Sequence, residues 1–169
     1  MIRDEKIWSK RPLCAAIGVT GDYFERAQEL VKNGCNVLFI DVAHGHHVLL
    51  KNVIKELKDE FGRDVEVIGG SIATKKAAQD LCEWGVDGIR VGIGNGSLCE
   101  TRIRTGVGLP QITVLSDVCS VADNYSVPCI ADGGVRYVGD VSKAIGAGAD
   151  SVMLGSCLLY TSPSPRDRG

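Results

Sequence analysis

The amino-acid sequence predicts an α/β fold, an incomplete (β/α)8 TIM barrel with about six of its eight strand–helix units. Three observations lead to this prediction. Short apolar segments alternate with amphipathic ones, glycine ends three of the amphipathic segments, and polar residues gather where the apolar segments end. Such alternation is typical of parallel strands joined by helices.

The apolar segments are predicted to be strands because they are short, rich in β-branched residues and bounded by glycine, proline or aspartate. They span residues 13–19, 37–41, 65–70, 88–93, 128–132 and 151–155. No segment reaches the roughly 20 apolar residues that a membrane-spanning helix needs.

The segments between the strands are predicted to be helices, because their apolar residues recur at intervals of three and four positions. The successive apolar faces contain Phe24, Ala27, Leu30 and Val31; Leu50, Val53, Ile54, Leu57 and Phe61; Ala77, Ala78, Leu81 and Cys82; Val118, Val121, Ala122 and Tyr125; and Val141, Ala144 and Ile145.

A weak internal repeat marks three junctions between helix and strand. Each junction has glycine followed two residues later by Asn or Asp, as in Gly34-Cys35-Asn36, Gly85-Val86-Asp87 and Gly148-Ala149-Asp150. Glycine accepts the left-handed conformation that closes a helix, and Asn or Asp then turns the chain into the next strand.

Polar residues distinguish a barrel from an open sheet. Strand after strand is followed by such residues, namely Asp41 and His44, Ser71 and Thr74, residues 94–99, residues 132–134, and Gly155 with Ser156. One rim that collects functional groups from most strands is typical of a barrel, whereas an open sheet gathers them at one switch point. Because six strands are too few to close the barrel, we expect further strands outside this sequence.

Composition limits the classes of partner. The 169 residues carry a net charge of −2 that is spread along the chain, with no basic stripe and no acidic tail. This argues against nucleic acid or a membrane surface and for small molecules or copies of the same chain. The seven cysteines form no C-x-x-C pair and the chain begins without a signal peptide, which predicts a reduced, cytoplasmic protein.

The segment VGIGNGSLCETR is the strongest candidate for chemistry. Its glycines, Gly92, Gly94 and Gly96, do not have the spacing of a dinucleotide fingerprint, but they leave backbone groups open to an ion, and Ser97 offers a hydroxyl to phosphate. Cys99, held in such a loop, is either a thiolate nucleophile or an ordinary buried cysteine. The residue types alone leave both interpretations open.

Several long segments resemble successive barrel segments of the inosine-monophosphate (IMP) dehydrogenase family, which includes guanosine-monophosphate (GMP) reductase. They are IDVAHGH, VIGGSIAT, VGIGNGSLCETRIRTGVGLPQ, IADGGVR and GDVSKAIGAGADSVMLGS, between about Leu13 and Ser156. AHGH and IADGG look more like the dehydrogenase. The resemblance implies that a cysteine adds to C2 of IMP, that hydride passes to NAD, and that the thioimidate is hydrolysed to xanthosine monophosphate.

The resemblance also implies roles for individual residues. Cys99 and Thr101 match catalytic positions. Ser97, Gly133, Gly134, Gly155 and Ser156 match a phosphate-binding set, and Asp132 matches the carboxylate that accepts from the ribose hydroxyls. The cofactor positions are Asp41, Ser71, Arg90, Gly92 and Gly94, and the backbone carbonyls of Gly94, Gly96 and Cys99 match ligands of a potassium ion.

Other residues receive a structural interpretation. His44, His46 and His47 lack metal-site spacing, so we expect them to end a strand and open a helix, with His44 near the cofactor site. The six cysteines other than Cys99 are expected mostly to pack in the interior. Ser71 stands where the family usually has asparagine, and Glu100 is expected to raise the thiol pKa of Cys99.

The resemblance sets expectations for the ends of the chain. Residues 1–156 match strands 3 to 8 of the family barrel, and residues 157–169 resemble a translated vector sequence without helical periodicity. The family's flap, whose Arg-Tyr pair activates water, has no counterpart, so a dehydrogenase fragment of doubtful activity, a GMP reductase and an inert nucleotide-binding fragment all remain possible. A homotetramer is expected for the complete protein only.

Overall fold

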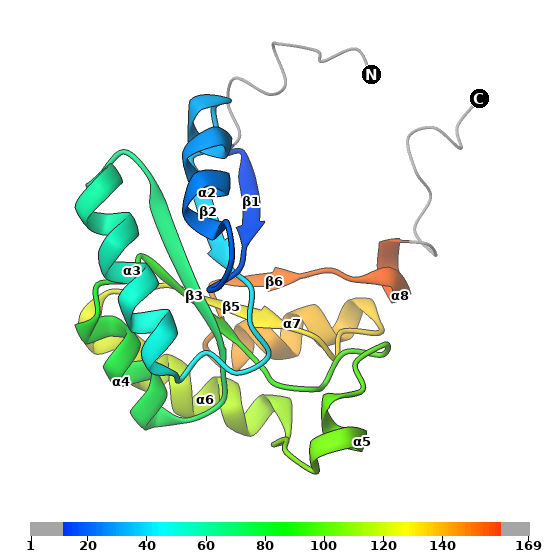
Figure 1. Cartoon of the computed structure of the whole chain (residues 1–169). Coiled ribbons are helices and arrows are strands. Elements are labelled where there is room, and N and C mark those ends of the chain that lie inside the picture. The colour runs from blue at the N-terminus through cyan, green and yellow to red at the C-terminus, as the bar shows by residue number, and fades with distance from the viewer. Residues whose placement is uncertain (1–11, 160–169) are drawn as a thin grey trace.

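The computed structural model describes residues 12–159, and its six strands form one parallel sheet in sequence order. Figure 1 shows the sheet curving with helices on its outer side, as in an incomplete barrel. The predicted fold and all six predicted strands are confirmed, although most strands are shorter than expected. They are β1 (Cys14–Ile17), β2 (Val37–Ile40), β3 (Glu66–Ile72), β4 (Gly88–Val91), β5 (Cys129–Asp132) and β6 (Ser151–Met153).

Helices connect successive strands, as the apolar periodicity predicts. They are α2 (Tyr23–Lys32), α3 (Val48–Phe61), α4 (Lys75–Glu83), α5 (Thr101–Thr105), α6 (Gln111–Ala122), α7 (Val138–Gly146) and α8 (Ser156–Leu159), with a 3-10 turn over Asp123–Tyr125. Figure 1 places α5 away from the sheet, on the segment that leads from β4 to α6. Within residues 12–159, no helix is long and apolar enough to cross a membrane.

Helices α3 and α4 illustrate how the sequence determines these elements. The imidazole of His47 accepts a hydrogen bond from the Leu49 amide at 3.1 Å, and the Thr74 hydroxyl accepts from the Ala77 amide at 3.2 Å. Each side chain satisfies a backbone N–H that the first turn leaves without a partner. The inward faces then bury large aliphatic side chains such as Leu57 and Leu81 against the sheet, at about 1.5–3 kcal/mol for each side chain.

The three repeated junctions form one device, called here the strand clamp: Asn36, Asp87 and Asp150, each hydrogen-bonded to the strand that precedes its own. Their backbone amides donate to Leu13, Val67 and Cys129 at 2.9 Å. Their side chains accept from the amides of the same three residues, at 3.3, 2.6 and 2.7 Å. The glycines two residues earlier have φ of 90°, 89° and 106°, as the sequence predicts. Each clamp therefore fixes the register of two neighbouring strands.

Three expectations need correction. Tyr125 lies in the 3-10 turn, because α6 ends at Ala122. Cys14 is exposed, while Cys35, Cys119 and Cys129 are buried as expected and Cys82 and Cys157 are intermediate. Residues 157–159 are helical rather than irregular, since the Leu158 amide donates to the Gly155 carbonyl at 3.2 Å and opens α8. The remainder of the predicted tail lies outside the described residues.

Candidate functional site

Two clefts meet at the rim formed by the carboxyl ends of the strands. The first cleft, of about 330 Å³, is lined by residues 96–99, 132–136 and 153–157. The second, of about 260 Å³, is lined by residues 41–43 and 92–96 together with Ser71, Arg90, Cys99, Thr101, Asp132 and Gly133. Both clefts include Gly96, Cys99, Asp132 and Gly133. A group held at Cys99 can therefore face an occupant of either cleft.

The predicted site residues divide between these clefts. The first contains the predicted phosphate and ribose positions, which are Ser97, Asp132, Gly133, Gly134, Gly155 and Ser156. The second contains the predicted cofactor positions, which are Asp41, Ser71, Arg90, Gly92 and Gly94, as well as Thr101. Residues from five strand ends are thus brought together in two adjacent sets.

Cys99 is exposed, and its environment favours the thiolate. Its Sγ lies 3.2 Å from the Thr101 hydroxyl, and its amide donates to the Gly96 carbonyl at 3.1 Å. Hydrogen bonds from the Thr101 hydroxyl and amide to the sulfur lower the pKa of the Cys99 thiol, and the positive charge of Arg102 adds to this effect. The thiol at the junction of the clefts therefore ionises more readily than an ordinary cysteine.

The expectation that Glu100 raises the pKa of Cys99 is wrong. The Glu100 carboxylate forms an exposed ion pair with Arg104, one turn further along α5. The pKa of Cys99 is instead lowered, and the groups that oppose this are burial and the charge of Asp132. Because the Glu100 charge is paired and in water, its effect on the sulfur is screened.

Arg90 lies between two carboxylates, Asp41 in the second cleft and Asp132, which lines both clefts. Its Nη2 donates to Asp41 Oδ1 at 2.6 Å, and its Nε lies 3.7 Å from Asp132 Oδ2. Burial raises the pKa of Asp132, an effect that Arg90 opposes and Asp41 reinforces. The Arg90 Nε is buried without a hydrogen-bond partner, so the wall of the second cleft holds a donor that a polar ligand can satisfy.

Gly92 allows strand β4 to pass very close to its neighbours. A Cβ on Gly92 would lie 2.4 Å from the Asp132 carbonyl oxygen and 2.7 Å from Gln111 Oε1, and the residue has φ of 130°. Only glycine fits such a position without displacing backbone atoms.

Gln111 is a residue that the sequence analysis missed. Its Nε2 donates to the carbonyls of Val91 and Asp132 at 2.9 and 3.3 Å, while its buried Oε1 has no partner. Asn95 Nδ2 also donates to the Asp132 carbonyl, at 2.9 Å. Gln111 could have been recognised from its position, because it is the last residue of TGVGLPQ, which belongs to one of the segments that resemble the family.

Two of the three histidines, His46 and His47, have structural partners. His46 Nε2 lies 2.7 Å from Asp80 Oδ2, and His47 caps α3. His44 borders neither of the two clefts and instead lines a neighbouring cavity of about 270 Å³ with His47, Val19 and Leu50. Val42 and Ala43 line both this cavity and the second cleft, so His44 adjoins the predicted cofactor position.

The donor set in the glycine loop suits an ion bound by carbonyl oxygens. Among residues 12–159, no group of three or more His, Cys, Asp or Glu side chains could hold a metal ion. The Gly96 carbonyl already accepts the Cys99 amide, and a carbonyl oxygen has a second lone pair for a cation. Neutral carbonyl oxygens of this kind fit a hard monovalent cation better than a transition metal.

A parallel α/β half-barrel with two clefts at its rim and an exposed, ionisable cysteine between them has the arrangement of a barrel enzyme. Residues 3–168 match the model of the IMP dehydrogenase / GMP reductase domain. The chain therefore belongs to this family of oxidoreductases, whose members use NAD or NADP.

Similar proteins carry both names. IMP dehydrogenase from Nitrosopumilus maritimus is 46% identical over 92% of this chain and 33% of its own length. GMP reductase from Leishmania major is 49% identical over 89% of this chain and 31% of its own length. The solved structure of a cysteine-to-alanine variant of Trypanosoma brucei GMP reductase with guanosine 5'-monophosphate has a TM-score of 0.82 and 48% identity, covering 85% of this chain and 30% of that one. The chain thus spans about a third of the length of the relatives it matches.

Proposed function

We propose that the protein to which this chain belongs oxidises IMP to xanthosine monophosphate with NAD, through a covalent bond to Cys99. The observation that carries the proposal is the position of the Cys99 sulfur, at the junction of the two clefts and 3.2 Å from the Thr101 hydroxyl. A nucleotide in the first cleft can then present its purine to the sulfur while its C2 hydrogen faces the second cleft.

The residues of the first cleft bind and orient the nucleotide. Ser97, Gly134 and Ser156 offer hydroxyl and amide donors to a phosphate, and the Asp132 carboxylate accepts hydrogen bonds from the two ribose hydroxyls. The Cys99 thiolate adds to C2, and Thr101 holds a proton or water beside the sulfur. Water later attacks the thioimidate at C2, the carbon–sulfur bond breaks, and the thiol is restored.

The second cleft is proposed to hold the dinucleotide, and the glycine loop is proposed to hold an ion. NAD, when bound there, accepts the hydride that leaves C2. Asp41 and Arg90 offer charged partners to its polar groups, and Gly92 and Gly94 allow its ring to approach the backbone. The carbonyls of Gly94, Gly96 and Cys99 would hold potassium and stiffen the loop. A homotetramer is proposed for the complete protein.

GMP reduction with NADPH is the second candidate, because a GMP reductase is among the relatives most similar to this chain and a related structure contains GMP. Both reactions use a cysteine that adds to C2, so the described site accommodates either. We favour IMP oxidation because the AHGH and IADGG segments look more like those of the dehydrogenase.

The test uses the full-length protein and its Cys99→Ala variant. We expect IMP with NAD to produce NADH in the wild type only, and mass spectrometry to find a nucleotide adduct on Cys99. Turnover of GMP with NADPH but not of IMP would establish the second candidate. Absence of both activities and of any adduct in a folded full-length protein would overturn the assignment of Cys99 and favour an inert nucleotide-binding chain.

A further inference from the structure

The Asp41 loop, residues 41–47, joins β2 to α3 and brings one wall of the second cleft into place. Asp41 stands at its start, where its amide donates to the Ile17 carbonyl at 2.9 Å and its carboxylate accepts from Arg90. Residues 41–43 line the cleft, whereas His46 lies outside the lining residues of both rim clefts. The position of the cleft wall therefore depends on how the rest of this loop is held.

The middle of the loop is fixed to the end of β3. The Gly45 amide donates to the Ser71 carbonyl at 2.7 Å, and the Ser71 amide donates to the Val42 carbonyl at 3.4 Å. A Cβ on Gly45 would lie 2.9 Å from backbone atoms of Gly70, so the loop rests directly on the strand. This contact positions the loop relative to Ser71, which lines the second cleft as Asp41 does.

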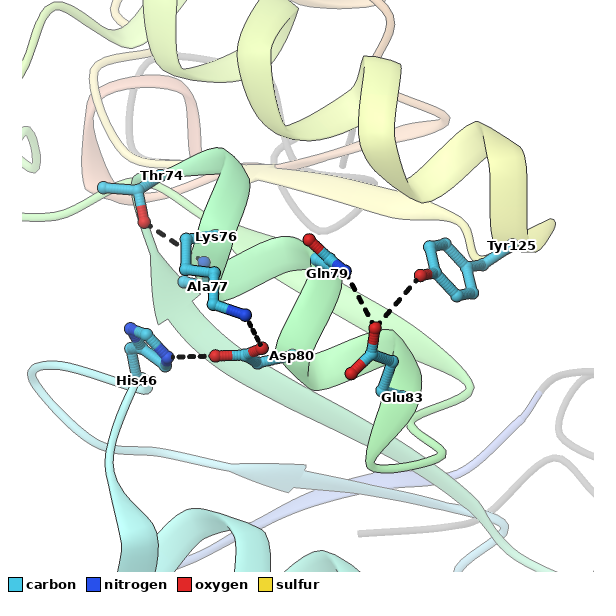
Figure 2. A network of polar contacts seen from close by, with 8 residues as sticks. All are labelled: His46, Thr74, Lys76, Ala77, Gln79, Asp80, Glu83 and Tyr125. Carbon is cyan, nitrogen blue, oxygen red and sulfur yellow. Dashed lines mark hydrogen bonds and ion pairs between the residues drawn. The ribbon is translucent and has the colours of Figure 1, made fainter.

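The far end of the loop is fixed to helix α4 by a side chain, as Figure 2 shows. His46 Nε2 lies 2.7 Å from Asp80 Oδ2, and Asp80 Oδ1 accepts from Lys76 Nζ at 2.6 Å. The His46 ring also lies 6.0 Å from the ring of Trp84, over which Lys51 Nζ sits at 5.9 Å. Hydrogen bonds from Lys76 and then His46 lower the pKa of Asp80, so this carboxylate is a charged acceptor at neutral pH.

We infer that His46 and Asp80 are positioning residues for the dinucleotide, acting from outside the cleft through the Asp41 loop. The inference rests on the proposed function. Two polar contacts fix the loop beyond Val42 to its neighbours: the Gly45 amide to β3, and the His46 side chain to α4, next to the capping residue His47. Release of His46 loosens the Gly45 contact, and Asp41 then samples positions in which its carboxylate faces the cleft less often.

The lining of the nucleotide cleft does not include His46 or Asp80, and the cleft is linked to the Asp41 loop through Arg90, which pairs with both Asp41 and Asp132. The lining residues follow β4, β5 and β6, and none of them belongs to the Asp41 loop or to α4. A positioning role thus predicts a selective effect on the dinucleotide, whereas general destabilisation of the fold would weaken both ligands together.

The experiment compares His46→Ala, His46→Gln and Asp80→Ala in the full-length protein. We expect His46→Ala and Asp80→Ala to raise the KM and the calorimetric Kd of the dinucleotide about tenfold, the usual cost of one charge-assisted hydrogen bond, with the nucleotide Kd unchanged. His46→Gln restores a donor to Asp80 and should recover most of the loss. Combining His46→Ala with Asp80→Ala should add little, because both remove the same contact.

Gln79→Ala is the matched control, since Gln79 is exposed on the same helix and its side-chain amide donates to Glu83 at 2.9 Å, not to the His46–Asp80 pair. Hydrogen exchange gives a readout that needs no turnover: the Gly45 amide should exchange faster in His46→Ala and not in the control.

The possible failures are distinguishable. Unchanged dinucleotide Kd and unchanged Gly45 exchange in His46→Ala would overturn the inference, as would equal loss of nucleotide and dinucleotide binding. If the wild type turns over neither substrate pair, the proposed function fails. Calorimetry with NAD and NADPH still decides the positioning role in that case, and failure of the wild type to bind either dinucleotide would overturn it.

Discussion

At the scale of single residues, the reactivity of the site depends on a hydrogen bond two positions away from the sulfur. Cys99 is exposed, so burial contributes little, and its lowered thiol pKa comes first from the Thr101 hydroxyl. Under the proposed function the threonine would serve two steps, since the hydroxyl that stabilises the thiolate would also lie beside the carbon bonded to the sulfur, to which water adds.

Thr101→Val should make Cys99 a weaker nucleophile. Loss of the hydroxyl removes the main group that lowers the thiol pKa, so the midpoint of the pH profile for alkylation by iodoacetamide should move to higher pH. The alkylation rate at pH 7 should fall accordingly, because the thiolate is the reacting form. Thr101→Ser keeps the hydroxyl and should keep the wild-type profile. Identical profiles for all three proteins would show that the hydroxyl does not act on the sulfur.

Gly92→Ala should destabilise the fold by about 2–4 kcal/mol, because the new Cβ meets the Asp132 carbonyl and the backbone is strained at positive φ. Gly62→Ala is the control: Gly62 also has positive φ, of 59°, but a Cβ there meets nothing within 4 Å, so about 1 kcal/mol is expected. Urea denaturation of the two variants measures the difference, and equal losses would contradict the close approach at Gly92.

At the scale of elements, side chains of Asn and Asp control where strands and helices begin. The strand clamp uses them between strands, and Asp140 uses its carboxylate at the start of α7, where it accepts from the amides of Arg136 and Tyr137 at 3.1 and 3.0 Å. In both cases the side chain accepts a hydrogen bond from a backbone N–H that has no partner within the adjoining strand or helix.

Asp150→Ala should cost about 1–3 kcal/mol of unfolding free energy, because the half-buried Cys129 amide loses its carboxylate partner. Asp150→Asn retains an oxygen acceptor and should recover part of this loss. Denaturation measures the stability, and exchange of the Cys129 amide localises the change to the junction of β5 and β6. A loss of stability without faster exchange there would argue against the clamp.

Asp140 should make the start of α7 sensitive to acid. Hydrogen bonds from Lys143 and from the two backbone amides lower the pKa of Asp140 to about 2, against about 3.9 for an unfolded chain. Since the folded pKa is the lower one, the stabilisation is complete above the unfolded value and is lost as pH falls from about 4 through 2. The stability difference between wild type and Asp140→Asn should therefore be constant from pH 8 to 5 and shrink below pH 4. A difference that grows in acid would refute this assignment.

At the scale of the whole molecule, the sequence predicts the architecture well and the lateral contacts poorly. Alternating periodicities locate every strand, and residues at strand ends assemble into the two clefts because parallel strands end at one rim. His46 and its partner Asp80 are 34 positions apart in the sequence, and Gln111 is 20 positions from Val91, whose carbonyl accepts its side-chain hydrogen bond. Such contacts depend on the rotation and tilt of helices about the sheet, which periodicity leaves undetermined. The ion pair of Glu100 with Arg104 is different, because it joins residues four positions apart on one helix face and sequence spacing could have indicated it.

The strand clamp has a consequence for how the chain reaches its native state. Its three side-chain bonds join residues 23, 20 and 21 positions apart, so each closes within one strand–helix–strand unit. A contact of this range has a smaller loop-closure cost than a pairing between distant segments of the chain would have. Each new unit can dock on the one before it as soon as its own strand emerges from the ribosome. The barrel wall can then form in the order in which its strand–helix–strand units are synthesised, with the strand clamp holding each new unit to the one before it.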